Sequence, residues 1–324
     1  MQLQDTFGRK FKYLRLSITE LCNFRCNYCL PDGNACDTPT GGLSLHQIDT
    51  LVQAFAQLGT TKIRITGGEP ALRKDLCDII ALCKQTKGIE KVAMTTNAFR
   101  LKKDAKKYKE SGLDALNVSA DSLDPRMFAA ITGKKKLDDI LEGVEAAIDM
   151  GIKEIKFNTV MLKQFNYNEL HTFFDYLKQH PVTWRFIELM QTGDNQRFFS
   201  QNHVAGETIK SLLLDQGWER IIRGNDAGPA QEFSHSDYLG NIGLIMPYSK
   251  DFCTTCNRLR VSSQGKLHLC LFAEQGQDIL PYLESGDVAA TVEAITHHVQ
   301  DKQAKHFLQE GFTGATKQLA MLGG

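Results

Sequence analysis

The sequence predicts an α/β fold: a partial (β/α)6 barrel of the TIM type followed by a small C-terminal α+β region. Short apolar strands alternate with amphipathic helices from Phe11 to about Met190. Repeated strand–helix units favour a parallel sheet with right-handed crossovers. About six such units are present, fewer than the eight of a closed barrel. After Gly193 the pattern changes to loops and hairpins, which marks the end of the repeat.

The individual elements follow from local patterns. The predicted strands occupy residues 11–18, 62–66, 91–96, 114–119, 154–160 and 183–189. Ahead of the second strand, Ser44 and Gln47 form a capping box that starts a helix. Ile48, Leu51 and Phe55 then recur at helical spacing. Further helices are predicted near residues 75–86, 101–111, 137–150 and 166–179.

Polar residues recur on one face of these strands. Successive side chains of a strand alternate between faces, so Arg15 opposes Leu14 and Leu16. The same parity places further polar residues on that face: Tyr13, Ser17, Arg64, Thr66, Asn117, Ser119, Lys156 and Asn158. In a single strand, such polar residues could simply face solvent. Because the pattern repeats along the sheet and buried charges are costly without partners, it favours a wet or ligand-filled cavity.

The C-terminal part has a different organisation. A loop-rich passage covers residues 191–229, and two hairpins are expected beyond it. The first spans residues 237–245 with a turn at Gly240–Asn241, and the second spans residues 258–270 with a turn near Gly265. The predicted regions are therefore 1–229, the barrel, and 230–324, the C-terminal region.

Composition narrows the classes of function. Lys+Arg and Asp+Glu each number 38 in 324 residues, so no global basic field favours nucleic acid or a membrane surface. The N-terminus lacks the apolar segment of an export signal, and no run is apolar enough to span a bilayer. Nine cysteines without an export signal favour reduced thiols in metal or redox roles. These features predict a cytoplasmic protein.

The most informative motif is Cys22-x3-Cys26-x2-Cys29, directly after the first strand. Three closely spaced thiolates can hold three corners of a 4Fe–4S cluster. The fourth iron then lacks a local protein ligand, and an open metal position is where chemistry takes place. Structural zinc, the main alternative, needs four ligands that usually come in pairs. The motif therefore predicts a reactive iron–sulfur site.

A second set of three cysteines has the spacing Cys253-x2-Cys256-x13-Cys270. Its spacing leaves two interpretations open: a zinc site completed by His268, or a second cluster with an open iron. Arg258 and Arg260 lie beside it, and arginine binds phosphate oxygens in a bidentate manner. These neighbours favour a cluster next to a phosphate-bearing ligand. No ligand role is assigned to the other cysteines: Cys36, Cys77 and Cys83.

The first motif, with Tyr28 before its last cysteine, resembles the signature of radical S-adenosylmethionine enzymes. Gly67-Gly-Glu-Pro70, directly after the second strand, resembles the second element of that family. The resemblance implies a barrel of the radical S-adenosylmethionine type, whose open iron chelates S-adenosylmethionine and whose electron releases a 5′-deoxyadenosyl radical. The two glycines are expected to let backbone approach the methionine moiety.

Nearly the whole chain resembles one family, the GTP 3′,8-cyclases of molybdenum cofactor biosynthesis, which are lyases. The matching segments are Thr6-Phe-Gly-Arg9, Ile65-Thr-Gly-Gly-Glu-Pro70, Met94-Thr-Thr-Asn97, Asn117-Val-Ser119, Arg185-Phe-Ile-Glu-Leu-Met190, Asn257-Arg-Leu-Arg260 and Gly323-Gly324. The resemblance implies that GTP is converted to (8S)-3′,8-cyclo-7,8-dihydro-GTP. The radical would abstract the ribose 3′ hydrogen, the carbon radical would add to guanine C8, and the adduct would then be reduced to the product.

The resemblance also implies roles for single residues. Those expected to contact S-adenosylmethionine are Tyr28, Gly68, Ser119 and Met190. Those expected around GTP are Arg15, Arg64, Thr95, Lys156, Arg258, Leu259 and Arg260. The second cluster would bind guanine through its open iron, and the Gly323-Gly324 tail would enter the active site and assist catalysis.

The expected partners are a reductant protein such as flavodoxin, a downstream pterin synthase and a second copy of the chain in a homodimer. Two alternatives remain open at this point. One is a radical enzyme that modifies a peptide and uses its second cluster as an electron relay. The other is a C-terminal zinc ribbon that docks a partner protein.

Overall fold

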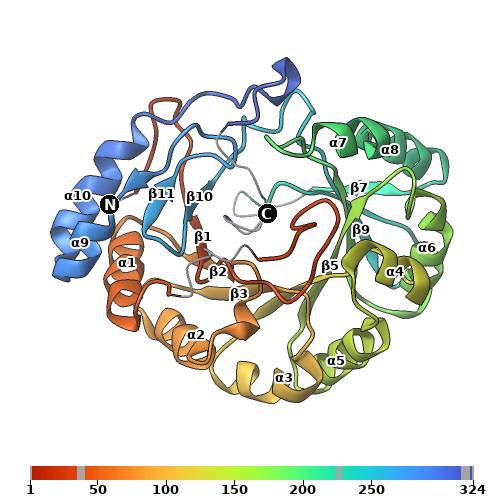
Figure 1. Cartoon of the computed structure of the whole chain (residues 1–324), viewed down its shortest axis with the longest axis horizontal. Helices are drawn as coiled ribbons and strands as arrows, with labels where there is room; N and C mark the ends of the chain where they lie inside the picture. Colours follow the sequence, from red (N-terminus) through yellow and green to blue (C-terminus); the bar gives the residue numbers. More distant parts are fainter. Residues whose placement is uncertain (1, 35–40, 223, 225–227, 315–321, 323–324) are drawn as a thin grey trace.

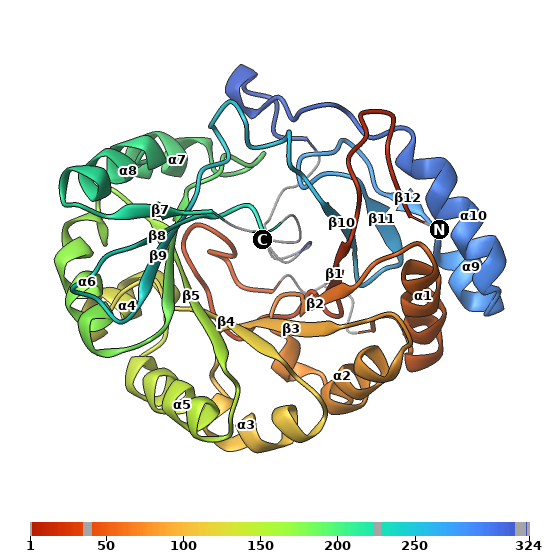
Figure 2. The same ribbon diagram turned by 180° about the vertical axis from the view of Figure 1, so that it is seen from behind.

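The computed structural model describes residues 2–34, 41–222, 224, 228–314 and 322. The predictions for Cys36, Gly323 and Gly324 lie outside these residues. The described strands form one sheet of twelve, in the order β12-β11-β10-β1-β2-β3-β4-β5-β6-β9-β8-β7. The sheet curves around the centre of the molecule, and helices cover its outer face (Figures 1 and 2). The α/β partial-barrel prediction is confirmed.

Six consecutive strands form the centre of this sheet, and all their neighbours are parallel. Their bounds are β1 Tyr13–Ser17, β2 Lys62–Thr66, β3 Lys91–Thr96, β4 Ala115–Ser119, β5 Glu154–Met161 and β6 Thr183–Glu188. Each agrees with a predicted strand to within a few residues. Because the strands are parallel, their C-terminal ends share one edge of the sheet, where loops can meet.

The predicted helices are also present. They are α1 Leu45–Gln57, α2 Leu76–Gln85, α3 Leu101–Glu110, α5 Leu137–Asp149 and α6 Leu170–Gln179. The capping box is formed as expected: the Gln47 backbone N–H donates to Ser44 Oγ at 3.2 Å, and Ser44 N–H donates to Gln47 Oε1 at 2.7 Å. The apolar side chains of α1 pack against the sheet, with Ile48 and Leu51 fully buried.

The structure contains further helices that the periodicity did not predict. They are α4 Pro125–Thr132, α7 Gln196–Asn202, α8 Gly206–Asp215, α9 Leu280–Ser285 and α10 Val288–Val299, with 3-10 turns at Pro70–Leu72, Tyr167–Glu169 and Leu308–Glu310. The sequence does carry a helix-start signal for α4: an N-cap residue, Asp124, followed by Pro125 at the first helical position. In the structure, Asp124 accepts a hydrogen bond from the backbone N–H of Met127.

The strands that follow β6 extend the central sheet at both edges. On one side, β10 (Arg258–Val261) pairs with β1 in parallel and is followed by antiparallel β11 (Lys266–His268) and β12 (Gln277–Asp278). On the other, β9 (Asn241–Ile245) pairs with β6 in parallel and is followed by antiparallel β8 (Gln231–Ser234) and β7 (Glu219–Ile221). The C-terminal region thus encloses the space inside the curved sheet.

One of the two predicted hairpins is confirmed and the other is shifted. β10 and β11 pair as expected, and Gly265 takes a positive φ of 71° in the turn between them. For the other hairpin, Gly240–Asn241 is not the turn. Asn241 begins β9, and its antiparallel partner is β8 at residues 231–234. The apolar run before Gly240 lies in the connection instead.

Among the helices that the structure describes, none combines the length and the apolar character needed to cross a lipid bilayer.

Candidate active site

A cavity of about 880 Å³ lies inside the curved sheet. It is lined by residues from the central strands and from the C-terminal region. They include Tyr13, Arg15, Lys62, Arg64, Asn117, Asn158, Arg185, Met190, Cys253, Cys256, Arg258, Arg260, Cys270 and Lys302. The prediction that the polar strand face lines a cavity is therefore confirmed for β1, β2, β4 and part of β5.

Three arginines form one layer across this cavity. Strand register pairs Arg15 with Arg64 of β2 on one side and with Arg260 of β10 on the other. Burial, followed by the nearby Arg258 charge, lowers the pKa of Arg260 to about 10. Burial and the neighbouring Arg260 charge likewise depress the pKa of Arg15. Buried like charges destabilise a protein unless an anion compensates them, so the layer fits a polyanionic ligand.

Two arginines of this layer, and Thr95 two residues beyond its level on β3, have buried polar atoms without a hydrogen-bond partner among the described residues. Arg64 Nε, Arg260 Nη1 and Thr95 Oγ1 are buried and make no hydrogen bond with any described residue. Buried polar groups are nearly always hydrogen-bonded in native proteins. All three residues are among those that the resemblance assigns to GTP, and their unsatisfied groups fit a ligand rich in oxygen acceptors.

The second cysteine set opens onto the same cavity. Cys253, Cys256 and Cys270 all line it and are close enough to influence one another electrostatically. Although burial opposes ionisation, Arg258 and Lys302 lower the pKa of Cys256 to about 7. A thiolate is the form that binds iron, so this cationic surrounding favours metal ligation. Lys302 is itself buried and donates to the Leu269 carbonyl.

His268 and Cys270 have different surroundings in the structure. Strand β11 ends at His268, so alternation does not continue to Cys270. The imidazole packs on Gly276, where a Cβ would lie 2.6 Å from Nε2. Cys270 lines the cavity, whereas His268 is not among the lining residues. Strand register nevertheless pairs His268 with Arg260, whose side chain lines the cavity.

The first cysteine set lies on the loop that follows β1. Burial and the charge of Asp121 raise the pKa of the Cys26 thiol, and Cys29 and Cys22 add to this effect. The three thiols are therefore neighbours. Cys29 packs beside Leu271 and Met190, which line the cavity. No three His, Cys, Asp or Glu side chains of the described residues are arranged around a single metal ion.

Tyr28 connects this loop to the end of β4. Its hydroxyl donates to Asp121 Oδ2 at 2.9 Å, and Asp121 Oδ1 accepts from the Val160 backbone N–H at 2.9 Å. Burial raises the pKa of Asp121 to about 6. The tyrosine ring and Met190 both pack against the cluster formed by Leu271 and Leu322. Two residues that the resemblance assigns to S-adenosylmethionine, Tyr28 and Met190, are thus brought together.

The Gly67-Gly-Glu-Pro70 loop docks directly onto the cysteine loop. Gly68 N–H donates to the Thr19 carbonyl at 2.8 Å, and Glu69 N–H donates to the Leu21 carbonyl at 2.7 Å. A Cβ on Gly68 would collide with the Leu21 carbonyl. The structure thus gives this glycine a reason that the sequence did not suggest: contact with the backbone that leads to Cys22.

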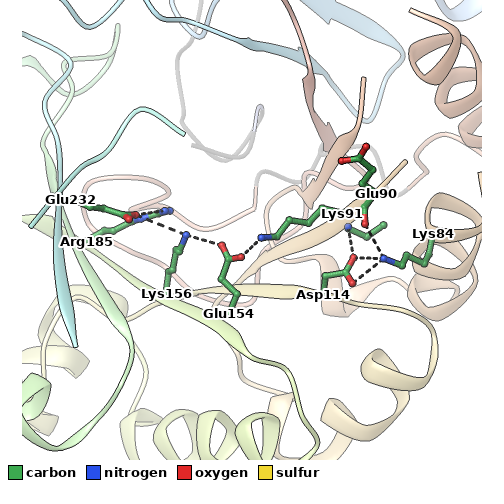
Figure 3. A network of polar contacts seen from close by, with 9 residues as sticks. Lys84, Glu90, Lys91, Asp114, Glu154, Lys156, Arg185 and Glu232 are labelled. Atoms are coloured by element: carbon green, nitrogen blue, oxygen red, sulfur yellow. Dashed lines mark hydrogen bonds and ion pairs between the residues drawn. The ribbon is translucent and has the colours of Figure 1, made fainter. Parts of the chain in front are cut away.

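Lys156 lies elsewhere than the other cations assigned to GTP. It lines a second cavity of about 730 Å³ at the N-terminal ends of the strands, which shares Lys62 with the first cavity. Its Nζ forms ion pairs with Glu154 at 2.7 Å and Glu232 at 3.9 Å (Figure 3). Burial and the nearby Arg185 charge lower the pKa of Lys156 to about 8.

Two further residues were assigned to ligands, Leu259 to GTP and Ser119 to S-adenosylmethionine. Leu259 alternates with Arg258 and Arg260 on β10, so its side chain is fully buried in the apolar core behind the cavity. Ser119 is the last residue of β4 and pairs with Asn158. Neither side chain is among those lining the first cavity.

Several lining residues had not been assigned a role. Tyr13 and Asn158 were placed on the polar strand face but were not proposed as binding residues. The alternation of side chains along the strands could have predicted that they line the cavity. Arg185 stood in a quoted motif. Lys62 and Lys302 had no signal in the sequence, because their position depends on how distant segments come together.

Two family models match successive parts of the chain. The radical SAM superfamily model matches residues 16–177, and the Molybdenum Cofactor Synthesis C model matches residues 182–308. Two relatives that match over the full length are both GTP 3′,8-cyclases. The GTP 3′,8-cyclase of Cronobacter sakazakii is 51% identical, covering 100% of this chain and 99% of that protein. That of Tolumonas auensis is 52% identical, covering 100% and 97%.

The chain belongs to the GTP 3′,8-cyclase family of radical S-adenosylmethionine enzymes. Members of this family work with S-adenosylmethionine and two 4Fe–4S clusters, and the two cysteine sets fit that pair. The fold is shared with more distant enzymes. Streptococcus suis SuiB, solved with S-adenosylmethionine, superposes with a TM-score of 0.64 at 15% identity over 88% of this chain and 68% of its own.

Proposed function

We propose that this enzyme converts GTP to (8S)-3′,8-cyclo-7,8-dihydro-GTP, an early step of molybdopterin synthesis, inside the 880 Å³ cavity. The observation that carries the proposal is the joining of the second cysteine set and the arginine layer in one enclosed space. Ligand cavities commonly measure about 300–1,000 Å³, which accommodates a nucleoside triphosphate. Guanidinium groups match phosphate oxygens in charge and in hydrogen-bond geometry.

The cysteines would hold the two clusters. Cys22, Cys26 and Cys29 would ligate the first, and Cys253, Cys256 and Cys270 the second. When bound, the first cluster and S-adenosylmethionine supply the one-electron chemistry that removes the ribose 3′ hydrogen. We assign Tyr28, Gly68, Ser119 and Met190 to S-adenosylmethionine. The packing of Tyr28, Cys29 and Met190 against one cluster, Leu271 and Leu322, supports this assignment.

The side chains of the cavity would bind and orient GTP. Arg15, Arg64, Arg258 and Arg260, which line the cavity, would receive the phosphates and ribose, and Thr95 would contribute its buried hydroxyl. Lys156 would act from the second cavity, which Lys62 connects to the first, and Leu259 through its main chain. The enclosed sheet would exclude water and hold the ribose near the guanine, so that the ring closes intramolecularly.

The C-terminal tail is proposed to enter this site. Leu322 is buried and forms an apolar cluster with Leu271, against which Tyr28, Cys29 and Met190 pack. The chain therefore reaches the boundary between the two cysteine sets just before Gly323 and Gly324. Two glycines add no side-chain bulk, so they suit a tail that approaches the substrate and assists catalysis.

The proposal includes the wider setting. The enzyme would be a cytoplasmic homodimer that receives electrons from a protein such as flavodoxin and passes its product to a pterin synthase. Residues 1–229 would carry the first cluster, and residues 230–324 the second cluster and the tail.

The decisive experiment is anaerobic incubation with S-adenosylmethionine, reductant and GTP, followed by mass analysis. We expect deoxyadenosine and a cyclised nucleotide. Cys26→Ala should abolish both products, whereas Cys256→Ala should retain deoxyadenosine and lose the nucleotide. Deoxyadenosine from Cys26→Ala would disprove the assignment of the first site. Iron and zinc counts on the same protein test the zinc-ribbon alternative, and a peptide-modifying enzyme would leave GTP unchanged.

A further inference from the structure

The aromatic ring of Tyr13 lies in a row of cations that crosses three strands. Strand register pairs Tyr13 of β1 with Lys62 of β2 on one side and with Arg258 of β10 on the other. The tyrosine is only 3% exposed and lines the first cavity together with both of these residues. No other aromatic residue occurs in β1, β2 or β10. The ring is therefore a single aromatic group among positive charges, two residues before Arg15 of the arginine layer.

Two of the surrounding cations contact the ring. The Lys62 Nζ lies 5.1 Å from the ring centroid of Tyr13, and the central guanidinium carbon of Arg64 lies 5.5 Å from it. A cation within about 6 Å of an aromatic centroid is attracted by the electron-rich face of the ring. Lys62 and Arg64 are two residues apart on β2, so both side chains extend from the same face of the strand. One ring thus contacts two cations that succeed each other along the cavity wall.

The ring restrains these cations without neutralising them. Neither Lys62 nor Arg64 forms an ion pair with a carboxylate of the described residues, and Arg64 Nε also lacks a hydrogen-bond partner there. In the same sheet, Lys91 and Lys156 are instead paired with Glu154. A carboxylate cancels the charge of its partner, whereas an aromatic ring attracts a cation and carries no net charge. The charges beside Tyr13 therefore remain available to an anion.

The position of Lys62 gives this restraint a consequence. Lys62 lines both the first and the second cavity, so its ammonium group lies where the two spaces adjoin. A lysine side chain has a flexible four-carbon stem and loses conformational freedom when it binds a ligand. A side chain that the ring already holds in place has less of this freedom left to lose, so it binds an anion more tightly.

We propose that Tyr13 is a positioning residue for the anionic part of the substrate. Its ring holds Lys62 and Arg64 at the wall of the first cavity and leaves their charges free for phosphate oxygens. The inference rests on the proposed function, in which GTP is the substrate.

The test is steady-state kinetics of the reconstituted two-cluster enzyme with GTP. Tyr13→Leu keeps an apolar side chain and removes the aromatic face. Loss of desolvated cation–π contacts should raise KM for GTP about tenfold. The value of kcat and the KM for S-adenosylmethionine should change less than about twofold, because binding and not chemistry is affected. Tyr13→Phe keeps the ring and should restore most of the affinity for GTP. The matched control is Tyr282→Leu, since Tyr282 is 38% exposed on α9.

A double-mutant cycle with Lys62→Met shows whether the ring acts through its cations. If it does, Tyr13→Leu should raise KM for GTP clearly less in the Lys62→Met background than in wild type, because part of the interaction is already gone. Equal increases in the two backgrounds, or a wild-type KM in Tyr13→Leu, would overturn the inference.

Two further outcomes are covered by the same design. If Tyr13→Leu fails to fold, Tyr13→Met takes its place with the same expectations, because methionine adapts to an irregular space. If the wild-type enzyme neither binds nor converts GTP, the proposed function fails and not the role of the ring. The two failures are therefore distinguishable.

Discussion

Charged side chains of the same sheet form two groups, and the two groups are balanced differently. In one group, cations and carboxylates alternate: Lys91 with Glu154, Lys156 with Glu154, and Arg185 with Glu232 at 3.2 Å (Figure 3). In the other group, Arg15, Arg64 and Arg260 stand side by side. There Arg64 and Arg260 still hold buried N–H groups with no hydrogen-bond partner among the described residues.

The comparison distinguishes charges that stabilise the fold from charges that bind a ligand. A network that balances its own charge contributes to folding whether or not a ligand is present. A layer of like charges lowers the stability of the fold until an anion binds. Such a layer is therefore explained by binding of a ligand and not by a contribution to folding. Mutations in the arginine layer should therefore lower activity without lowering stability, whereas mutations in the Lys91–Glu154 pair of the network should lower stability without lowering activity.

The largest effect is expected for Arg260→Met. Loss of one buried charged contact to a phosphate should lower kcat/KM for GTP about a hundredfold. Deoxyadenosine formation should continue, uncoupled from cyclisation. Without GTP, urea unfolding should show equal or greater stability, by up to about 1 kcal/mol, because one repulsive charge is gone. The exposed Arg126→Met is the matched control, and a stability loss in Arg260→Met alone would break the comparison.

A smaller effect, on stability, is expected for Glu154→Gln in the network. Although burial opposes it, pairing with Lys156 and Lys91 lowers the pKa of Glu154 from 4.5 to about 2. A carboxylate with a lowered pKa stabilises the fold above its unfolded pKa and loses this contribution as pH falls toward 2. Because its side chain is 34% exposed, we expect a loss of only about 1 kcal/mol at neutral pH.

Chemical unfolding of wild type and Glu154→Gln across pH measures this difference, which should shrink progressively below pH 4.5. Glu142→Gln, in the exposed pair with Lys102, should show no measurable change at any pH. A pH-independent loss in Glu154→Gln would mean that its contribution is packing rather than charge.

The smallest effect is expected for Lys91→Met. Glu154 keeps Lys156 as a partner, and Lys91 is 34% exposed, so the loss should stay below about 0.5 kcal/mol. Thermal unfolding compared with Glu154→Gln would rank the pairs within the network. A larger loss for Lys91→Met than for Glu154→Gln would contradict the assigned order.

The sequence predicted much of this molecule because local rules act within short segments. The central strands, the capping box at Ser44 and the polar strand face all follow from periodicity of side chains. The cysteine motifs followed from spacing. Less local features were missed: the partner strand of β9, and the helices around the C-terminal region.

By itself, the sequence determined the alternation of strands and helices, the two cysteine sets and the side of each strand that carries charge. Only the tertiary structure decided which charges are balanced. Arg64 and Lys156 follow the same strand parity, yet Arg64 leaves Nε unsatisfied while Lys156 reaches Glu154 and Glu232. Glu232 comes from a strand added at the sheet edge. Whether a buried charge has a partner depends on segments far apart in the chain, and no local pattern records that.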